Sequence, residues 1–216
     1  MARPRFNADK AAWLPSRPTC AELDAWLAGA NDGIELVKRN ERRSVYTLAP
    51  AAGEPPRYYL KHDHPQGPRD LGKGLIRPKP RLEYLTACRL QEAGVPVVQP
   101  VAAAWAGVQG IFLSHAVARA VAADELWHRV AGAAGRRRAY LEGLKDLLAT
   151  VIEAGLRHPD LHLGNIICVE DDDRTHCRLV DVFGVSCGHD LDDDDVLRLL
   201  LLFAPFARRL DAGERA

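Results

Sequence analysis

The most constraining feature of the sequence is a polar loop placed between a helical pattern and a strand pattern. Residues 158–165, HPDLHLGN, follow apolar residues at helical spacing over 136–154 that end at Gly155. The apolar run 166–169 comes next, and a second apolar run over 177–182 follows the acidic turn EDDDRT. This order predicts a helix, a polar loop and two strands, with polar residues at the strand ends.

The N-terminal half predicts a small sheet with one inserted helix. Its short segments carry β-branched or aromatic residues between polar or Gly/Pro turns, which favours strands. Residues 62–80 hold four prolines and three glycines among several basic residues, so we expect an irregular, basic loop there. The predicted elements of this half are strands over 34–37, 44–48 and 57–61, a helix over 81–93, and a hairpin of 97–105 and 111–117.

Two further helices are predicted near the ends of the chain. One lies within residues 1–30 with Thr19 as its cap, and the other begins near Asp192 and runs through Leu202. The acidic run 190–195 favours helix capping, since carboxylates at a helix N-terminus stabilise its dipole. Acidic residues also bind metals, and Asp190 also suits a brace for the polar loop. The pattern as a whole predicts an α+β fold.

Composition and charge narrow the class of protein. Hydrophobic residues make up 47% and charged residues 27%, with a formal net charge of zero, which is typical of a folded domain and not of an obligate nucleic-acid binder. The longest apolar stretch, 196–206, is interrupted by Arg198 and Pro205 and is shorter than the about 20 residues that span a bilayer. The N-terminal residues MARPRFNADKAAWLP lack the apolar region of a secretory signal.

The cysteines indicate a reducing compartment. There are five of them, they are widely scattered, and they contain no Cys-x-x-Cys pair. This pattern argues against a disulfide framework and against a zinc knuckle. We therefore expect a cytoplasmic protein, with at most peripheral contact with a membrane.

Three oxygen-bearing side chains in and after the polar loop predict phosphoryl transfer. A loop carboxylate at Asp160 can orient an acceptor hydroxyl and accept its proton. The amide oxygen of Asn165 and the carboxylate of Asp181, at the end of a predicted strand, are hard ligands of the kind that Mg²⁺ takes. Phosphoryl transfer depends on such positioning and charge neutralisation more than on covalent chemistry.

The pattern HPDLHLGN with a downstream Asp181 resembles the protein-kinase-like superfamily. The helix over 81–93 and the Gly-Val-Pro that follows it are similar to the lipopolysaccharide kinase (Kdo/WaaP) family. These resemblances cover residues 34–200 and imply a two-lobed fold with a small antiparallel sheet and one helix in the N-lobe. They imply a single kinase-like domain over 1–216, with the N-lobe at about 30–117 and a truncated, mainly helical C-lobe at about 118–216.

The resemblance also implies roles for individual residues and the cofactors ATP and Mg²⁺. Lys61 matches the phosphate-pairing lysine of the third strand, and Glu83 matches its ion-pair partner on the following helix. Asp160, Lys61 and Glu83 are the catalytic residues in this interpretation, and Asn165 and Asp181 hold the metal. Nucleotide contacts are expected at Lys61, Arg43, Ser44, Ser114 and Ala116.

Several departures from the superfamily pattern leave alternatives open. Residues 38–44, KRNERRS, contain no glycine where a phosphate-binding loop is expected, so arginine side chains or backbone amides have to cover the phosphates. The motif DVFG is one residue longer than Asp-Phe-Gly, and Pro159 stands where arginine or glycine is usual. The chain after Asp181 is short, which favours a small-molecule or glycolipid acceptor over a protein.

The resemblance implies ATP-dependent phosphorylation of a sugar hydroxyl, on Kdo or heptose, in the inner core of lipopolysaccharide at the cytoplasmic face of the inner membrane. The alternatives are a soluble kinase of the aminoglycoside or choline type and a non-catalytic pseudokinase module. The expected partner is lipopolysaccharide core or another sugar-containing small molecule, without nucleic acid, and the oligomeric state is left open. The basic loop 69–81 is equally suited to contact anionic lipid or to remain in solvent. The side chain of His162 is equally suited to contact a phosphate or solvent. His158 is interpreted as a structural anchor of the polar loop 158–165.

Overall fold

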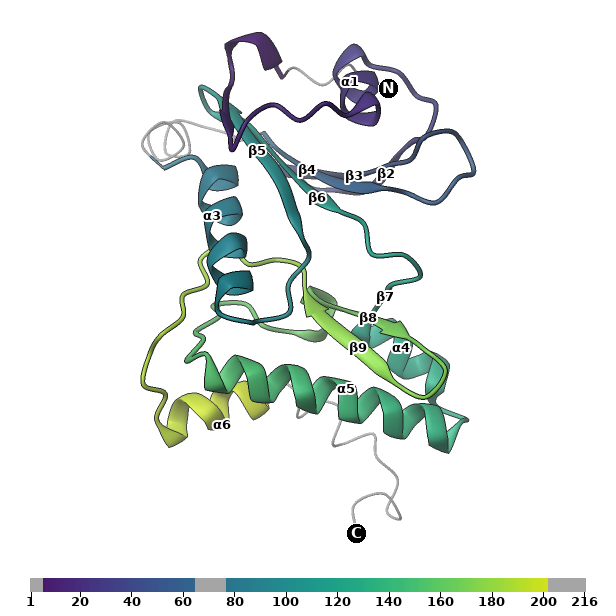
Figure 1. Ribbon diagram of the computed structural model, residues 1–216, viewed down its shortest axis with the longest axis vertical. Coiled ribbons are helices and arrows are strands. Elements are labelled where there is room, and N and C mark those ends of the chain that lie inside the picture. The colour runs from purple at the N-terminus through teal and green to yellow at the C-terminus, as the bar shows by residue number, and fades with distance from the viewer. Residues whose placement is uncertain (1–5, 65–76, 202–216) are drawn as a thin grey trace. The chain divides into compact units, whose positions relative to one another are not determined.

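The computed structural model describes residues 6–64 and 77–201 (Figure 1). The chain divides into two compact units, the first formed by Met1–Arg89 with Val98–Ala118 and the second by Leu90–Val97 with Arg119–Ala216. Most of the predicted basic loop, residues 65–76, lies outside the described residues.

The first unit is built on a six-stranded antiparallel sheet with the strand order β1-β5-β6-β4-β3-β2. The central strands are rich in β-branched and aromatic residues, which pack well on a pleated surface. The strands are β1 (Ala12–Leu14), β2 (Ile34–Arg39), β3 (Arg43–Leu48), β4 (Tyr58–Asp63), β5 (Pro100–Ala106) and β6 (Gln109–His115). The helical elements that begin in this unit are η1 (Ala8–Lys10), α1 (Ala21–Ala28) and α3 (Lys79–Glu92).

The register of β4 sends successive side chains to opposite faces of this sheet. Leu60 and His62 face an apolar core that includes Trp26 of α1, and Figure 1 shows α1 lying over the sheet. Burying such apolar surface stabilises the unit at about 25 cal/mol per Å². Lys61 and Asp63 consequently project from the opposite face.

The second unit packs helices against a three-stranded antiparallel sheet ordered β7-β8-β9. Helix α5 lies so close to β9 that a Cβ atom on Gly143 would come within 2.2 Å of the Thr175 carbonyl oxygen. The Tyr140 hydroxyl of α5 donates a hydrogen bond of 2.9 Å to the Ala123 carbonyl of α4. The elements are β7 (Val121–Ala122), α4 (Ala123–Val130), α5 (Ala134–Glu153), η2 (Leu163–Asn165), β8 (Ile166–Glu170), β9 (Thr175–Leu179) and α6 (Asp193–Leu201).

The predicted α+β fold is confirmed, and the differences lie in short elements and boundaries. The sequence reasoning missed β1, β7 and α4, although α4 buries Ala123, Leu126, Trp127 and Val130 at helical spacing. The predicted cap at Thr19 is wrong, because the residue before α1 is Cys20 and no side chain caps that helix. Among the described helices, none combines the length and apolar character needed to cross a membrane.

The cysteine pattern argued against a disulfide framework, but one pair of cysteines is joined by a disulfide. Cys168 and Cys177 occupy directly paired positions of β8 and β9 and are joined by a disulfide, with their Cα atoms 4.2 Å apart. Their pairing follows from the register of the hairpin, which cysteine spacing alone does not reveal. Cys20, Cys88 and Cys187 are free thiols.

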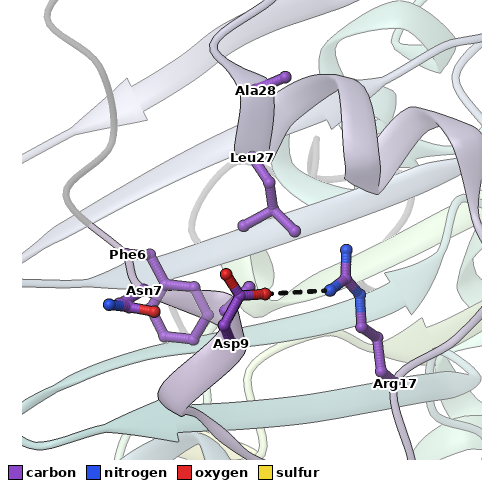
Figure 2. A pocket seen from close by; sticks show the side chains of 7 residues that line it. Phe6, Asn7, Asp9, Arg17, Leu27 and Ala28 are labelled. Carbon is purple, nitrogen blue, oxygen red and sulfur yellow. Dashed lines mark ion pairs between the residues drawn. The ribbon is translucent and has the colours of Figure 1, made fainter.

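A pocket of about 520 Å³ opens in the first unit between the N-terminal segment and α1. Figure 2 shows Phe6 and Leu27 on its wall together with the ion pair of Asp9 and Arg17, whose charged atoms are 3.8 Å apart. The pocket belongs to the part of the unit that packs on the α1 side of the sheet. Because Lys61 projects from the other face, this pocket is separate from the predicted nucleotide site.

Candidate active site

His158 connects the two parts of the predicted catalytic motif within the second unit. Its Nδ1 accepts a hydrogen bond from the backbone N–H of Asp160 at 3.1 Å, and its Nε2 lies 2.8 Å from the backbone carbonyl oxygen of Asp181. A carbonyl oxygen can only accept, so Nε2 carries the proton and Nδ1 carries the lone pair. The imidazole thus links the loop of Asp160 to the segment of Asp181, as expected of a structural anchor.

Burial favours the neutral form of this imidazole. Desolvation lowers the pKa of His158, and this effect outweighs the hydrogen bond to Asp181 and the nearby carboxylates, which raise it. A protonated ring would lose the lone pair that accepts the Asp160 N–H. The loop geometry therefore depends on a histidine that stays neutral at physiological pH.

Asn165 forms the second connection. Its side-chain Nδ2 donates to the backbone carbonyl of Asp160 at 2.8 Å, and its own backbone carbonyl accepts the N–H of Val180 at 3.1 Å. Because the amide nitrogen is directed to Asp160, the amide oxygen Oδ1 points the other way and keeps its acceptor capacity. One residue thereby fixes the loop and lies beside the residue that precedes Asp181.

Asp181 lies two residues beyond β9, which ends at Leu179 rather than continuing to residue 182 as predicted. The chain then turns at Gly184, which adopts a φ of 79° that glycine tolerates best. Val182 is buried, whereas Phe183 is 36% exposed. The additional residue in Asp-Val-Phe-Gly therefore places valine, and not phenylalanine, in the core.

The segment after Asp181 is hydrogen-bonded to the residues that precede the loop 158–165. Arg157 and Ser186 exchange backbone hydrogen bonds of 2.8 and 3.1 Å. At Gly155, with a φ of 55°, an added Cβ would come within 2.0 Å of the His189 carbonyl oxygen, so a larger residue does not fit there. The loop is thus fastened at its start as well as by His158.

The acidic run at 190–195 contains a helix cap, in agreement with the favoured interpretation. Asp192 Oδ1 accepts the backbone N–H of Asp195 at 2.8 Å at the start of α6. The Asp195 carboxylate pairs with Arg157 at 2.7 Å, which is a brace of the kind expected of Asp190. The hydrogen bond from Arg157 holds the pKa of Asp195 below its usual value.

Asp160 and His162 present their side chains to solvent at the edge of the loop. The Asp160 side chain is 81% exposed, and its Oδ2 lies 3.8 Å from His162 Nε2. His162 Nδ1 accepts the backbone N–H of Gly164 at 3.1 Å, so this histidine caps η2. An exposed carboxylate on a fixed backbone is suited to receive an incoming hydroxyl.

The oxygen atoms of the second unit fit a magnesium ion shared with a nucleotide. Asn165 Oδ1 and the Asp181 carboxylate are hard ligands, and Mg²⁺ in phosphate-transfer sites takes its other ligands from water and phosphate oxygens. Within residues 6–64 and 77–201, no group of three or more His, Cys, Asp or Glu side chains gathers as a metal centre. Asn165 and Asp181 are thus the residues that would hold such an ion.

Lys61 and Glu83 form an ion pair in the first unit. Lys61 Nζ contacts Glu83 Oε1, and the two side chains are 14% and 1% exposed. In the register of the sheet Lys61 stands between Val45 of β3 and Phe112 of β6, and its Nζ lies 5.7 Å from the centre of the Phe112 ring. The structure brings together the two residues that the sequence pattern paired.

The guanidinium of Arg43 holds the other side of Glu83. Its Nη2 lies 3.1 Å from Glu83 Oε2, and its Nε lies 2.7 Å from Asp63 Oδ1. Asp63 is directly opposite Arg43 in the β3–β4 register. Arg43 was predicted to contact the nucleotide, whereas in the structure its guanidinium binds two carboxylates of the protein.

The turn between β2 and β3 replaces a glycine-rich loop with an asparagine. Asn40 Oδ1 accepts the backbone N–H groups of Arg42 and Arg43 at 2.9 and 2.7 Å. The N–H of Asn40 in turn donates to the Arg43 carbonyl at 2.9 Å. These amides are used inside the turn, so they do not form the open nest that binds phosphate in other loops.

The other predicted nucleotide residues occupy different places in the first unit. Ser44 is buried on the face opposite Lys61, and its Oγ lies 2.9 Å from His64 Nε2. The backbone N–H of Ala116 donates to the Arg57 carbonyl at 2.8 Å. Ser114 lies on the same sheet face as Lys61, one row further along, because it is two residues from the cross-strand partner of Lys61.

Asp63 and Asn40 were not singled out from the sequence. The signal for Asp63 was its place two residues after Lys61 in one strand, since that spacing puts both side chains on one face. The signal for Asn40 was an asparagine in a short hairpin without glycine, where its side chain binds the backbone two residues on.

The antiparallel sheet with its Lys61–Glu83 pair, and the helix, loop and hairpin that carry Asp160, Asn165 and Asp181, define a protein-kinase-like fold. The profile of the lipopolysaccharide kinase (Kdo/WaaP) family matches residues 31–183, well over half of the chain. The chain belongs to this family.

Solved structures of WbdD share the fold. One crystal structure has a TM-score of 0.54 at 15% sequence identity and covers 78% of this chain and 36% of that one. A co-crystal structure of WbdD with the kinase inhibitor LY294002 has a TM-score of 0.54 at 16% identity and covers 81% and 37% of the two chains. The chain thus spans little more than a third of the length of these WbdD chains. No curated protein matches the chain.

Proposed function

We propose that this protein is an ATP-dependent kinase that phosphorylates a sugar hydroxyl, on Kdo or heptose, of the lipopolysaccharide inner core. The observation that carries the proposal is the fixing of Asp160 by His158 and Asn165 in a chain of the lipopolysaccharide kinase family. An exposed carboxylate whose backbone is bound on both its N–H and C=O sides has the fixed position that an acceptor-orienting group needs.

In this proposal each of the predicted site residues has a separate role in phosphoryl transfer. Asp160 orients the acceptor hydroxyl and accepts its proton. Asn165 Oδ1 and the Asp181 carboxylate hold Mg²⁺, which when bound neutralises charge on the phosphates. Lys61, held by Glu83, pairs with the phosphates, and Ser114 on the same sheet face contributes to the nucleotide site.

The relatives in structure support a nucleotide site in this fold. WbdD is described as a bifunctional kinase-methyltransferase, and it has been crystallised with a kinase inhibitor. In our proposal the acceptor is a sugar of lipopolysaccharide, which the protein meets from the cytoplasm through peripheral contact with the inner membrane. A soluble kinase of the aminoglycoside or choline type is the alternative that shares the loop pattern.

A transfer assay with radiolabelled ATP tests the proposal. The acceptors are unphosphorylated lipopolysaccharide cores, aminoglycosides, choline and a generic protein substrate, each with and without Mg²⁺. We expect Mg²⁺-dependent labelling of the lipopolysaccharide core alone. Preferential labelling of an aminoglycoside or of choline would replace this proposal with the soluble alternative.

The glycine-free turn at Asn40 favours a second candidate, a pseudokinase that binds without turnover. The two candidates differ in an equilibrium measurement, because a ligand that binds the folded state raises its thermal stability. A folded protein that Mg²⁺ with ATP or GTP does not stabilise, and that labels none of the acceptors, would be a binding module and not an enzyme.

A further inference from the structure

We infer that Arg43 is a positioning residue of the phosphate site, which acts by clamping Glu83 so that Glu83 holds Lys61. The inference rests on the proposed kinase function and gives Arg43 a different role from the nucleotide contact expected from the sequence. The guanidinium of Arg43 joins Asp63 of β4 to Glu83 of α3.

The clamp consists of two cations and two carboxylates in alternation. Asp63 binds Arg43, Arg43 binds Glu83 Oε2, and Lys61 binds Glu83 Oε1. The side chains of Arg43 and Asp63 are only 11% and 14% exposed, and that of Glu83 is 1% exposed. Buried charges need partners on every side, and here each charge has at least one opposite neighbour within the network.

Arginine is suited to this place for a geometric reason. Its planar fork offers donors in several fixed directions, so one guanidinium can bind carboxylates on two different elements at once. The ammonium group of lysine is a compact point charge and cannot span both carboxylates in the same way. With Oε2 held by Arg43, the Glu83 carboxylate cannot rotate away from Lys61 without breaking a second charged bond.

The turn before β3 makes the orientation of Lys61 more important than usual. Asn40 binds the N–H groups of Arg42 and Arg43 inside the turn, so backbone amides contribute less to phosphate binding there. Side-chain cations then carry more of the phosphate interaction, and a buried carboxylate fixes Lys61 for that role. In this inference the guanidinium of Arg43 binds the carboxylates of the network, and the ammonium group of Lys61 binds the nucleotide.

A double-mutant cycle tests whether Arg43 acts through Lys61. The variants are Arg43→Met, Lys61→Met and the double substitution, and the readouts are kcat and KM for ATP, the Kd of Mg-ATP, and the Tm. We expect Arg43→Met to lower kcat/KM at least about tenfold, as is typical when an outer partner of a binding residue is lost. In the Lys61→Met background the same change should have no further effect on kcat/KM.

Arg57→Met is the matched control. Arg57 also binds a buried glutamate of the first unit, Glu22, at 3.2 Å, but this pair does not include Lys61. We expect it to alter the Tm without changing kcat/KM. An Arg43→Met variant that keeps wild-type kcat/KM, or one whose loss is equally large without Lys61, would overturn the inference.

A second variant covers the case in which Arg43→Met does not fold. Arg43→Lys keeps the charge but loses the bridge between Asp63 and Glu83, so we expect a folded protein with reduced kcat/KM. Wild-type kinetics in Arg43→Lys would then overturn the inference. Failure of the proposed function gives a different result, since the wild-type protein itself would then not phosphorylate the lipopolysaccharide core.

Discussion

Asn165 donates a hydrogen bond from its side-chain nitrogen to the backbone carbonyl of Asp160, 2.8 Å away. The residue proposed to bind the metal therefore also fixes the residue proposed to receive the acceptor. Metal binding and acceptor positioning share one amide group, whose nitrogen faces the loop and whose oxygen is left as a ligand. A change in that amide should affect both.

Asn165→Asp separates these two roles. The substitution keeps an oxygen ligand but replaces the donor toward Asp160 with a second acceptor, which a carbonyl cannot bind. We expect kcat to fall by about 10- to 100-fold, with a loss of about 1–3 kcal/mol in the free energy of unfolding. Steady-state kinetics over a Mg²⁺ titration, with urea unfolding alongside, measures both. Turnover close to wild type at any Mg²⁺ concentration would contradict the assigned role.

Asp160→Ala should abolish transfer without destabilising the fold. The carboxylate is 81% exposed, and the hydrogen bonds of this residue to His158 and Asn165 come from its backbone. We expect kcat to fall by at least about 10²-fold, the usual contribution of a general base, with an unchanged Tm. Asp173→Ala, which removes an exposed carboxylate from the β8–β9 turn, is the control and should keep full activity. Retained turnover in Asp160→Ala removes Asp160 from its role.

The burial of His62 should make the stability of the protein depend on pH. Burial lowers the pKa of His62 from 6.5 to about 4 in the folded protein, so the unfolded chain takes up its proton at a higher pH than the folded one. Stability is therefore complete above pH 6.5 and falls as the pH drops toward 4. The loss is about 2 kcal/mol at about pH 5.

His62→Phe should remove most of that dependence. The ring packs edge-on against Phe6 and Trp26, where a phenyl group fits without a titrating nitrogen. Urea unfolding at about pH 7.5 and about pH 5 should show a difference smaller by about 2 kcal/mol than in the wild type. Part of the slope should persist, because burial also lowers the pKa of His158. An unchanged pH dependence in the variant would exclude His62 as its source.

The sequence predicted features that depend on neighbouring residues in the chain, and it missed side-chain contacts that depend on the pairing of strands. The motif at 158–165 predicted a polar loop between a helix and a strand, and the structure has this loop between α5 and β8, because such a motif lies along one stretch of chain. The role of Arg43 depends on Asp63 and Glu83, one opposite it across two strands and the other on α3, and no spacing along the chain reports such a contact. For the same reason the Cys168–Cys177 pair was not predicted.

Substitution by alanine is predicted to have opposite effects on stability at the two glycines of α5, Gly135 and Gly143. At Gly143 a Cβ atom would lie 2.2 Å from the backbone oxygen of Thr175, whereas at Gly135 it would meet nothing within 4 Å. Gly143→Ala should therefore cost about 1–3 kcal/mol, because a backbone carbonyl of β9 has to move. Gly135→Ala should stabilise the protein by up to about 1 kcal/mol, because alanine has the higher helix propensity.

Urea midpoints at constant m-value measure this pair of variants. The opposite signs separate a packing effect from a general property of the helix, since both substitutions add one methyl group to the same element. The consequence reaches the site as well, because α5 packs on β9 and Asp181 follows β9 by two residues. We therefore expect Gly143→Ala, and not Gly135→Ala, to reduce kcat as well as stability. Equal stability changes in the two variants would show that α5 can shift away from β9 freely, against the close packing of Gly143 on Thr175.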